Sequence, residues 1–162
     1  MSAAKHEQDQ FTHLDPSGAA RMVDVAAKPV TARTAIASGR VIVSSQVIAL
    51  LRGGGMPKGD ALAVARIAGI QGAKRTSDLI PLCHPIGLTG VSVDLFVLDD
   101  AVQITARVKT TDRTGVEMEA LTAVSVAGLA LIDMVKAVDP AAVLSDVRVE
   151  SKSGGLSGDW TR

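Results

Sequence analysis

Two runs of alternating apolar and polar residues, separated by only two acidic residues, constrain the fold of this chain more than any other feature. Residues 91–98 place Val or Leu at every second position, and residues 102–109 repeat the pattern with Val, Ile and Ala. A period of two is typical of strands that bury one face, and Asp99-Asp100 between the runs is a turn sequence. We therefore expect an antiparallel hairpin in the middle of the chain.

Less regular strand patterns occur on both sides of this hairpin. Residues 30–43 alternate loosely and are rich in Val, Ile and Thr, which predicts a strand broken near Ser38-Gly39. Residues 143–151 predict a last strand. Residues 22–25 predict a short extended piece that ties down the polar N-terminal arm.

Two apolar segments between these strands predict helices. Asp60 is a typical N-cap for the first, in which Gly69 and Gly72 would permit a neighbour to approach closely. The second and longest helix is expected over residues 117–138, and a short helix over residues 45–51. The inward face of the first is expected to consist of Leu62, Ala65, Ile67, Ala68 and Ile70.

The order of these elements predicts an α+β fold. Strand, helix, two strands, helix and strand form the split βαβ or ferredoxin-like arrangement, an antiparallel sheet with its helices packed on one face. The other face then needs water, the N-terminal arm or another subunit. Residues 1–21 are expected to be a flexible arm and residues 22–162 a single domain.

Composition excludes several classes of protein. Seventeen basic and 17 acidic residues leave a formal net charge of zero, which argues against a nucleic-acid-binding protein. One cysteine cannot form an internal disulfide, so a reducing compartment fits best. Residues 1–10 have no apolar core of a secretory signal, and the apolar run 120–132 is too short to span a bilayer. We expect a soluble, cytoplasmic protein without a membrane partner.

The loop over residues 74–85 has the composition of a site. It holds two adjacent cations, the only cysteine, one of three histidines, and two prolines that disfavour regular structure. His84 suits a general acid or base, and a structural role is as probable from sequence alone. Cys83 is a weaker nucleophile candidate, because neighbours on extended backbone point to opposite sides. Zinc lacks ligands here, since the other histidines lie in the arm.

Acidic residues mark both ends of the longest predicted helix. Glu119 and Asp133 fall on nearly the same stripe but are separated by about 21 Å, too far to grip one small molecule. A two-fold interface, in which one subunit's helix start meets another's helix end, would bring them together. The alternative is that Asp133 and Lys136 form an ordinary surface pair. Glu117 shares a face with Glu119 only where the segment is extended, and both also suit a helix N-terminus.

Several cations lie at the ends of predicted elements. Lys58, Lys74, Arg75 and Lys152 would suit a polyphosphate if they cluster in space, and would only confer solubility if they are dispersed. The glycine run 53–55 could cradle phosphate, although a plain loop is the simpler interpretation without P-loop spacing. Acids, bases and cations without a redox or metal motif fit a lyase, isomerase or hydrolase acting on an anionic small molecule.

Long strings of residues in a defined order carry a family resemblance from residue 22 to about residue 160. They are MVDV at 22–25, KGD at 58–60, ARIAGIQ at 65–71, LIPLCHP at 79–85, TGVEMEALTA at 114–123, DMVKAV at 133–138 and KSGG at 152–155. The chain closely resembles the molybdenum-cofactor biosynthesis protein C (MoaC) family, the cyclic pyranopterin monophosphate synthases.

The resemblance implies a reaction and an assembly. The family converts 3′,8-cyclo-7,8-dihydro-GTP, made from GTP by a partner radical enzyme, to cyclic pyranopterin monophosphate and pyrophosphate. This acid/base rearrangement with cyclic phosphodiester formation needs no electron carrier. No cofactor is implied, although Mg²⁺ could accompany the triphosphate, and no metal site is expected in the protein. The family forms homo-hexamers, trimers of dimers with sites between subunits.

The resemblance also implies roles for individual residues. Asp133 would be the catalytic acid/base residue, with Lys136 one turn away and Lys58 supplied from a loop. The residues expected to bind substrate are Leu82, Cys83, His84, Glu117, Met118 and Glu119, with Lys74 and Lys152 near the triphosphate. Cys83 would contribute shape rather than a thiolate.

Two rival interpretations belong to other classes. An RNA-recognition module shares the order of elements but reads bases with strand aromatics, and Phe96 is the only aromatic residue in the predicted strands. A catalytically inactive homologue would bind the triphosphate as a regulator and form no product. The presence of all candidate polar residues weakens this second alternative.

Overall fold

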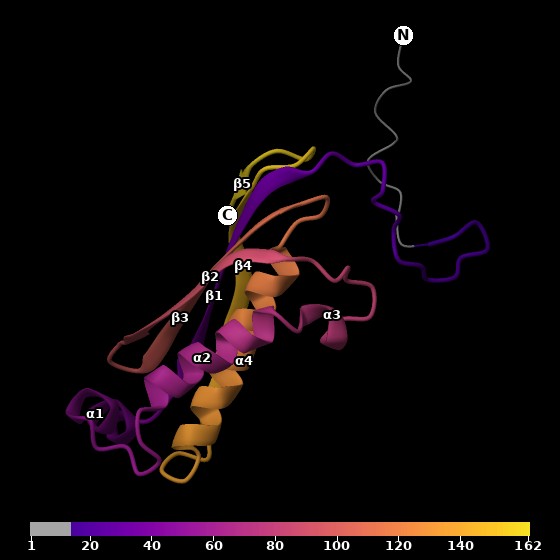
Figure 1. Ribbon diagram of the computed structural model, residues 1–162. Helices are drawn as coiled ribbons and strands as arrows, with labels where there is room; N and C mark the ends of the chain where they lie inside the picture. Colours follow the sequence, from indigo (N-terminus) through magenta and orange to yellow (C-terminus); the bar gives the residue numbers. More distant parts are fainter. Residues whose placement is uncertain (1–13) are drawn as a thin grey trace.

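Five antiparallel strands form one sheet in the order β2-β3-β1-β4-β5 in the computed structural model, which describes residues 14–162 (Figure 1). The first four strands have the ferredoxin-like order, which confirms the predicted fold class. The terminal strand β5 was not predicted. The strands are β1 (Thr31–Ile42), β2 (Leu88–Val97), β3 (Ala101–Asp112), β4 (Val143–Ser153) and β5 (Trp160–Thr161).

The predicted hairpin is present as β2 and β3. Val93 lies opposite Ala106 and Leu95 opposite Ile104, and all four side chains are buried. The Leu98 N–H donates to the Ala101 carbonyl at 2.8 Å, which closes the turn. The alternating pattern therefore predicted both the pairing and the buried face.

The first strand is continuous, so the predicted break near Ser38-Gly39 is wrong. β1 pairs with β3 along its whole length, and only its register with β4 shifts, on both sides of Ser38. Gly39 lies beneath α4 (Glu117–Val135), where a Cβ would come within 2.7 Å of Val124 Cγ1. The glycine marks a bulged pairing and a close helix approach rather than a strand end.

Two of the four helices, α2 and α4, cover one face of the sheet, as expected (Figure 1). Asp60 caps α2 by accepting a hydrogen bond from the Ala63 N–H at 2.9 Å, and Ser44 caps α1. A short helix, α3, interrupts the 74–85 segment, where regular structure was not expected. The helices are α1 (Ser45–Gly53), α2 (Ala61–Ala73), α3 (Thr76–Leu79) and α4, which ends at Val135 rather than at Val138.

Small residues bring α2 and α4 into close contact. A Cβ on Gly69 would lie 2.8 Å from the Ala123 carbonyl oxygen, and one on Gly72 would lie 2.8 Å from Val126 Cβ. The predicted inner face of α2 is therefore partly wrong: Ala65 is buried, but Ile67 is 61% exposed.

Among residues 14–162 only α4 is long and apolar enough to cross a membrane, and its packing against α2 and the sheet is that of a core helix.

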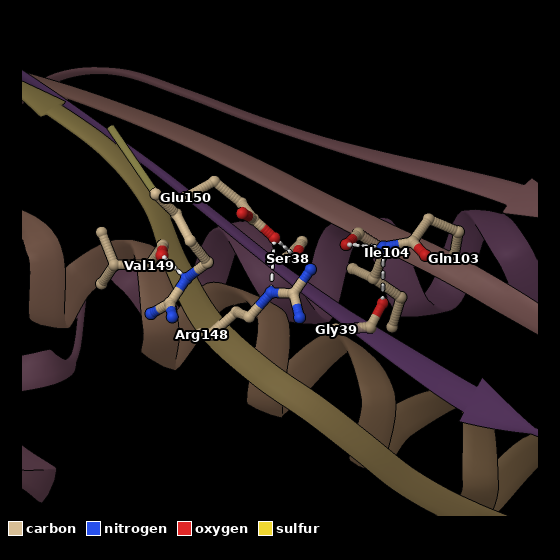
Figure 2. A network of polar contacts seen from close by, with 8 residues as sticks. Ser38, Gly39, Gln103, Ile104, Arg148, Val149 and Glu150 are labelled. Atoms are coloured by element: carbon tan, nitrogen blue, oxygen red, sulfur yellow. Dashed lines mark hydrogen bonds and ion pairs between the residues drawn. The ribbon is translucent and has the colours of Figure 1, made fainter. Parts of the chain in front are cut away.

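The opposite face of the sheet carries a polar network (Figure 2). The Ser38 hydroxyl and the Arg148 guanidinium both donate to Glu150, the latter at 2.8 Å. Together they lower the pKa of the Glu150 carboxyl, with Ser38 as the larger cause. Gln103 donates to the Gly39 carbonyl at 3.1 Å. These bonds satisfy polar groups on a face that the helices leave uncovered.

The N-terminal segment runs alongside the end of the molecule where α4 begins. Residues 22–25 lie outside the strands of the sheet. A hydrogen bond from His84 Nε2 to the Val23 carbonyl, at 2.7 Å, ties this segment down, as expected. Of the predicted flexible arm, residues 1–13 lie outside the described part of the chain. Residues 14–21 contain a turn in which Asp15 accepts from Ser17 and Ala19.

Candidate active site

The three predicted catalytic residues meet at the C-terminal end of α4. Lys136 Nζ lies 2.7 Å from Asp133 Oδ1, and Lys58 Nζ lies 3.3 Å from Asp133 Oδ2. Lys58 also donates to the main-chain carbonyl of Asp133 at 2.8 Å. We call Lys58, Asp133 and Lys136 the Asp133 cluster. Asp133 is thus bound by two lysines from different parts of the chain, which is more than an ordinary surface pair.

The two ammonium groups determine the charge of Asp133. Hydrogen bonds from Lys136 and then Lys58 lower the pKa of the Asp133 carboxyl, and their positive charges act in the same direction. The carboxylate is 56% exposed, so a second molecule can reach it. Asp133 is therefore an ionised group that can accept a proton, beside two groups that can donate one.

The glycine run places Lys58 in this cluster. Gly54 has a φ of 70° and ends α1, and the Gly55 N–H donates to the Leu50 carbonyl at 3.1 Å. Met56 is buried and anchors the next turn. Lys58 follows two residues later and extends to α4. The run thus ends a helix and positions a lysine, and nothing in its geometry requires it to bind phosphate.

Six of the eight predicted substrate-binding residues, all except Lys74 and Lys152, line a cavity of about 300 Å³ at the opposite end of α4. Its walls come from the loop after α3, the first turn of α4 and the N-terminal segment. We call it the apolar pocket. Its lining residues are Val23, Val25, Lys28, Leu82, Cys83, His84, Thr114, Gly115, Glu117, Met118 and Glu119.

The two glutamates in this pocket have different surroundings. The Glu117 carboxylate is paired with Lys152 Nζ at 3.3 Å. Glu119 is only 4% exposed. Burial, followed by the negative charge of Glu117, raises the pKa of Glu119 to about 7, partly offset by a hydrogen bond from its own main-chain N–H.

His84 and Cys83 have structural as well as lining roles. The Val23 carbonyl can only accept, so His84 Nε2 carries the proton of that bond. Burial, followed by the charge of Glu119, raises the pKa of the Cys83 thiol. A protonated thiol is consistent with the prediction that Cys83 supplies shape rather than a nucleophile.

A second, smaller cavity of about 190 Å³ adjoins the first and is lined by four cations, Lys28, Arg33, Arg113 and Lys152. We call it the basic pocket; it shares Lys28, Thr114, Gly115 and Glu117 with the apolar pocket. The turn at its rim includes Gly154, with a φ of 85°, where a Cβ would strike the Ala32 carbonyl. Only Lys152 of the four cations was predicted.

The missed cations come from three separate places in the chain. Arg33 is on β1 and donates to the Asp112 carbonyl at 3.1 Å, while Arg113 donates to the Lys28 carbonyl at 3.1 Å. Their position close to the KSGG turn depends on strand pairing, so no local spacing indicated them. Lys74, predicted near the triphosphate, is exposed at the end of α2 and lines neither pocket.

The Asp133 cluster lies at the C-terminal end of α4, and the two pockets lie at its N-terminal end. Fourteen residues of helix separate Glu119 from Asp133, a rise of about 21 Å. One subunit therefore does not bring its acid/base groups to its own pocket. Within residues 14–162 no three His, Cys, Asp or Glu side chains gather as metal ligands.

Comparison with known proteins identifies the family of this chain. The model of the MoaC family matches residues 22–155. A cyclic pyranopterin monophosphate synthase of Streptomyces coelicolor is 73% identical over 155 residues, 96% of this chain and 91% of the relative. The Nocardioides protein of the same name is 70% identical over 94% of this chain and 96% of its own length. Cyclic pyranopterin monophosphate synthase 2 of Mycobacterium tuberculosis is 59% identical over 99% of this chain and 96% of the relative. The chain belongs to the MoaC family.

Proposed function

We propose that this protein is a cyclic pyranopterin monophosphate synthase of molybdenum cofactor biosynthesis. As a phosphorus–oxygen lyase it would convert 3′,8-cyclo-7,8-dihydro-GTP to cyclic pyranopterin monophosphate and pyrophosphate. The observation that carries the proposal is the union of the apolar and basic pockets through Lys28 and Gly115. A ring system fits the first and a triphosphate the second. Family membership and the names of close relatives support the same activity.

The charges of the residues suit the proposed chemistry. Opening and closing rings requires protons to be removed and returned, and Asp133 accepts while Lys58 and Lys136 donate. Attack of a hydroxyl on the α-phosphorus builds charge on phosphate oxygens, which Lys28, Arg33, Arg113 and Lys152 would neutralise. Pyrophosphate then leaves from the basic pocket.

The separation along α4 supports active sites shared between subunits. The Asp133 cluster of one subunit would face the pockets of another across a two-fold interface. The proposed assembly is a homo-hexamer, a trimer of dimers. Lys74, which lies apart from both pockets of its own subunit, would contact the triphosphate only in such an assembly.

The proposed reaction also implies a cofactor requirement, a source of substrate and a domain organisation. The reaction needs no resident cofactor, and Mg²⁺, where it takes part, would arrive on the triphosphate. The substrate would come from a radical enzyme that acts on GTP, in the cytoplasm. Residues 22–162 would form the single catalytic domain.

Direct turnover tests the proposal. Purified protein is given 3′,8-cyclo-7,8-dihydro-GTP, and cyclic pyranopterin monophosphate and pyrophosphate are followed, with Asp133→Asn as the control. Product from the wild type alone supports the synthase. Tight binding without product would identify a regulatory homologue instead. The absence of both binding and product would refute the proposal.

A further inference from the structure

The loop that joins β4 to β5, residues 154–159, forms part of the basic pocket although half of its residues are glycine. We call it the C-terminal loop. Gly154, Gly155 and Gly158 have φ angles of 85°, 83° and 71°. A segment so rich in glycine has many alternative conformations, so a single conformation costs entropy. The loop therefore needs specific bonds to hold the conformation in which it lines the pocket.

The C-terminal loop touches two of the four cations of the basic pocket. The Ser157 hydroxyl accepts a hydrogen bond from Lys152 Nζ at 3.3 Å. Gly155 packs against Arg33, since a Cβ on this glycine would lie 2.5 Å from the guanidinium Nη1. Gly154 and Ser157 themselves line the pocket. A shift of the loop would therefore displace part of the pocket wall and remove a neighbour from both Lys152 and Arg33.

Asp159, the last residue of this loop, bonds back to its first residue. The Asp159 carboxylate accepts a hydrogen bond from the Gly154 N–H at 3.0 Å. A second bond within the loop joins the Gly158 N–H to the Gly155 carbonyl at 3.3 Å. Asp159 is exposed and lines neither the apolar nor the basic pocket. It can therefore act on the basic pocket only through the loop or through its charge.

We propose that Asp159 is a positioning residue for the basic pocket, because its bond to the Gly154 N–H fixes the C-terminal loop in the conformation that receives phosphate groups. A loop that is ordered beforehand does not have to be ordered during binding, which would reduce affinity. Charge alone predicts the opposite effect, since a carboxylate beside the pocket repels an anion. The kinetic test of this inference rests on the proposed function, whereas the binding test does not.

The binding test uses inorganic triphosphate and calorimetry. Asp159→Ala removes the acceptor and should weaken binding by about tenfold. Asp159→Asn keeps an oxygen acceptor without the charge, so its affinity should stay within about threefold of the wild type. Asp94→Ala, which removes an exposed acid from β2, is the control and should bind like the wild type. Unchanged or tighter binding by Asp159→Ala, or equal losses for Ala and Asn, would overturn the inference. Failure of the wild type to bind triphosphate would overturn it too.

The kinetic test separates positioning from a general loss of structure. With 3′,8-cyclo-7,8-dihydro-GTP, Asp159→Ala should raise KM by about tenfold and leave kcat within about twofold, because the Asp133 cluster lies at the other end of α4. A lower kcat with an unchanged KM would contradict the positioning role. If triphosphate binding follows the expected order but the wild type forms no product, the proposed function fails and the role of Asp159 stands.

Discussion

Lys58 and Asp133, which are 75 residues apart in the chain, are joined by two hydrogen bonds. Lys58 Nζ donates to the Asp133 carbonyl at 2.8 Å and to its carboxylate at 3.3 Å. The first bond satisfies a carbonyl in the last turn of α4, where helices leave such groups without partners. The second helps to keep Asp133 ionised. The same lysine therefore stabilises the end of the helix and the charge of the proposed base.

Replacement of this base should abolish turnover without unfolding the protein. Asp133→Asn keeps the size of the side chain but removes the charge that accepts a proton, so kcat should fall by about 100-fold or more. Because Asp133 is largely exposed, the melting temperature should change little. Asp94→Asn, an exposed carboxylate on β2, is the matched control and should keep full activity. Pyrophosphate release measures both, and comparable rates would remove Asp133 from the mechanism.

Shared sites predict complementation between inactive subunits. Glu119→Ala damages the pocket of one subunit, and Asp133→Asn damages the opposite end of α4, about 21 Å away. If each active site is built from the start of α4 in one subunit and the end of α4 in another, mixed assemblies contain some sites in which both helix ends are intact. Mixing the two inactive variants under conditions of subunit exchange should then restore part of the activity. No recovery, with exchange confirmed by mass spectrometry, would contradict shared sites.

The basic pocket predicts a loss of affinity for phosphate groups. Lys152 is half-buried and also bonds to Ser157, so its ammonium is held at the rim of the pocket. Lys152→Ala should raise KM by about tenfold or more and weaken inhibition by inorganic triphosphate similarly, because charge-assisted bonds are lost. Lys109→Ala removes an exposed cation from β3 and should change neither. An unchanged inhibition constant for Lys152→Ala would place the triphosphate elsewhere.

Sequence patterns predicted the sheet better than the helix faces. A strand that buries one face shows a period of two, and the β2–β3 hairpin followed that period residue by residue. In α2, apolar residues occur all around the helix, so periodicity could not identify the buried side. Ile67 is exposed because the contact with α4 is made by Gly69 and Gly72, which exclude larger side chains.

For the site too, sequence spacing predicted the contacts within one element but not those between distant parts of the chain. Asp133 and Lys136 are one helical turn apart, so their pairing follows from spacing alone. The position of Lys58 beside them came from the family resemblance, and Arg33 and Arg113 were missed. These cations come together because β1 lies between β3 and β4, a relationship that tertiary pairing creates and that no short motif contains.

The buried acid predicts how stability depends on pH. The pKa of Glu119 is about 7 in the folded protein and 4.5 in the unfolded chain. Between these values the unfolded chain releases the proton that the folded protein keeps, so the Glu119 contribution to stability is lost as pH rises. Glu119→Gln has no proton to lose, so its stability relative to the wild type should increase between pH 4.5 and 7. Urea unfolding at pH 5 and pH 8 measures the difference.

Glu150 provides an opposite control for that experiment. Ser38 and Arg148 lower the pKa of Glu150, so its contribution is present above the unfolded value of 4.5 and is lost as pH falls through the folded pKa. Glu150→Gln should therefore destabilise the protein about equally at pH 5 and pH 8. If the free energies of unfolding of wild type and Glu119→Gln differ by the same amount at both pH values, Glu119 is ionised throughout.

The contact between α2 and α4 predicts a steric limit at Gly69. A Cβ there would lie 2.8 Å from the Ala123 carbonyl oxygen, a main-chain atom that cannot turn aside. Gly69→Ala should therefore destabilise the protein by about 1–3 kcal/mol, less the gain of up to about 1 kcal/mol from the better helix propensity of Ala. Gly53→Ala, in the last turn of α1 with no atom within 4 Å, receives the same gain without the clash and should be neutral or stabilising. Chemical unfolding compares the two variants, and a Gly69→Ala protein as stable as Gly53→Ala would show that the helices can separate at no cost.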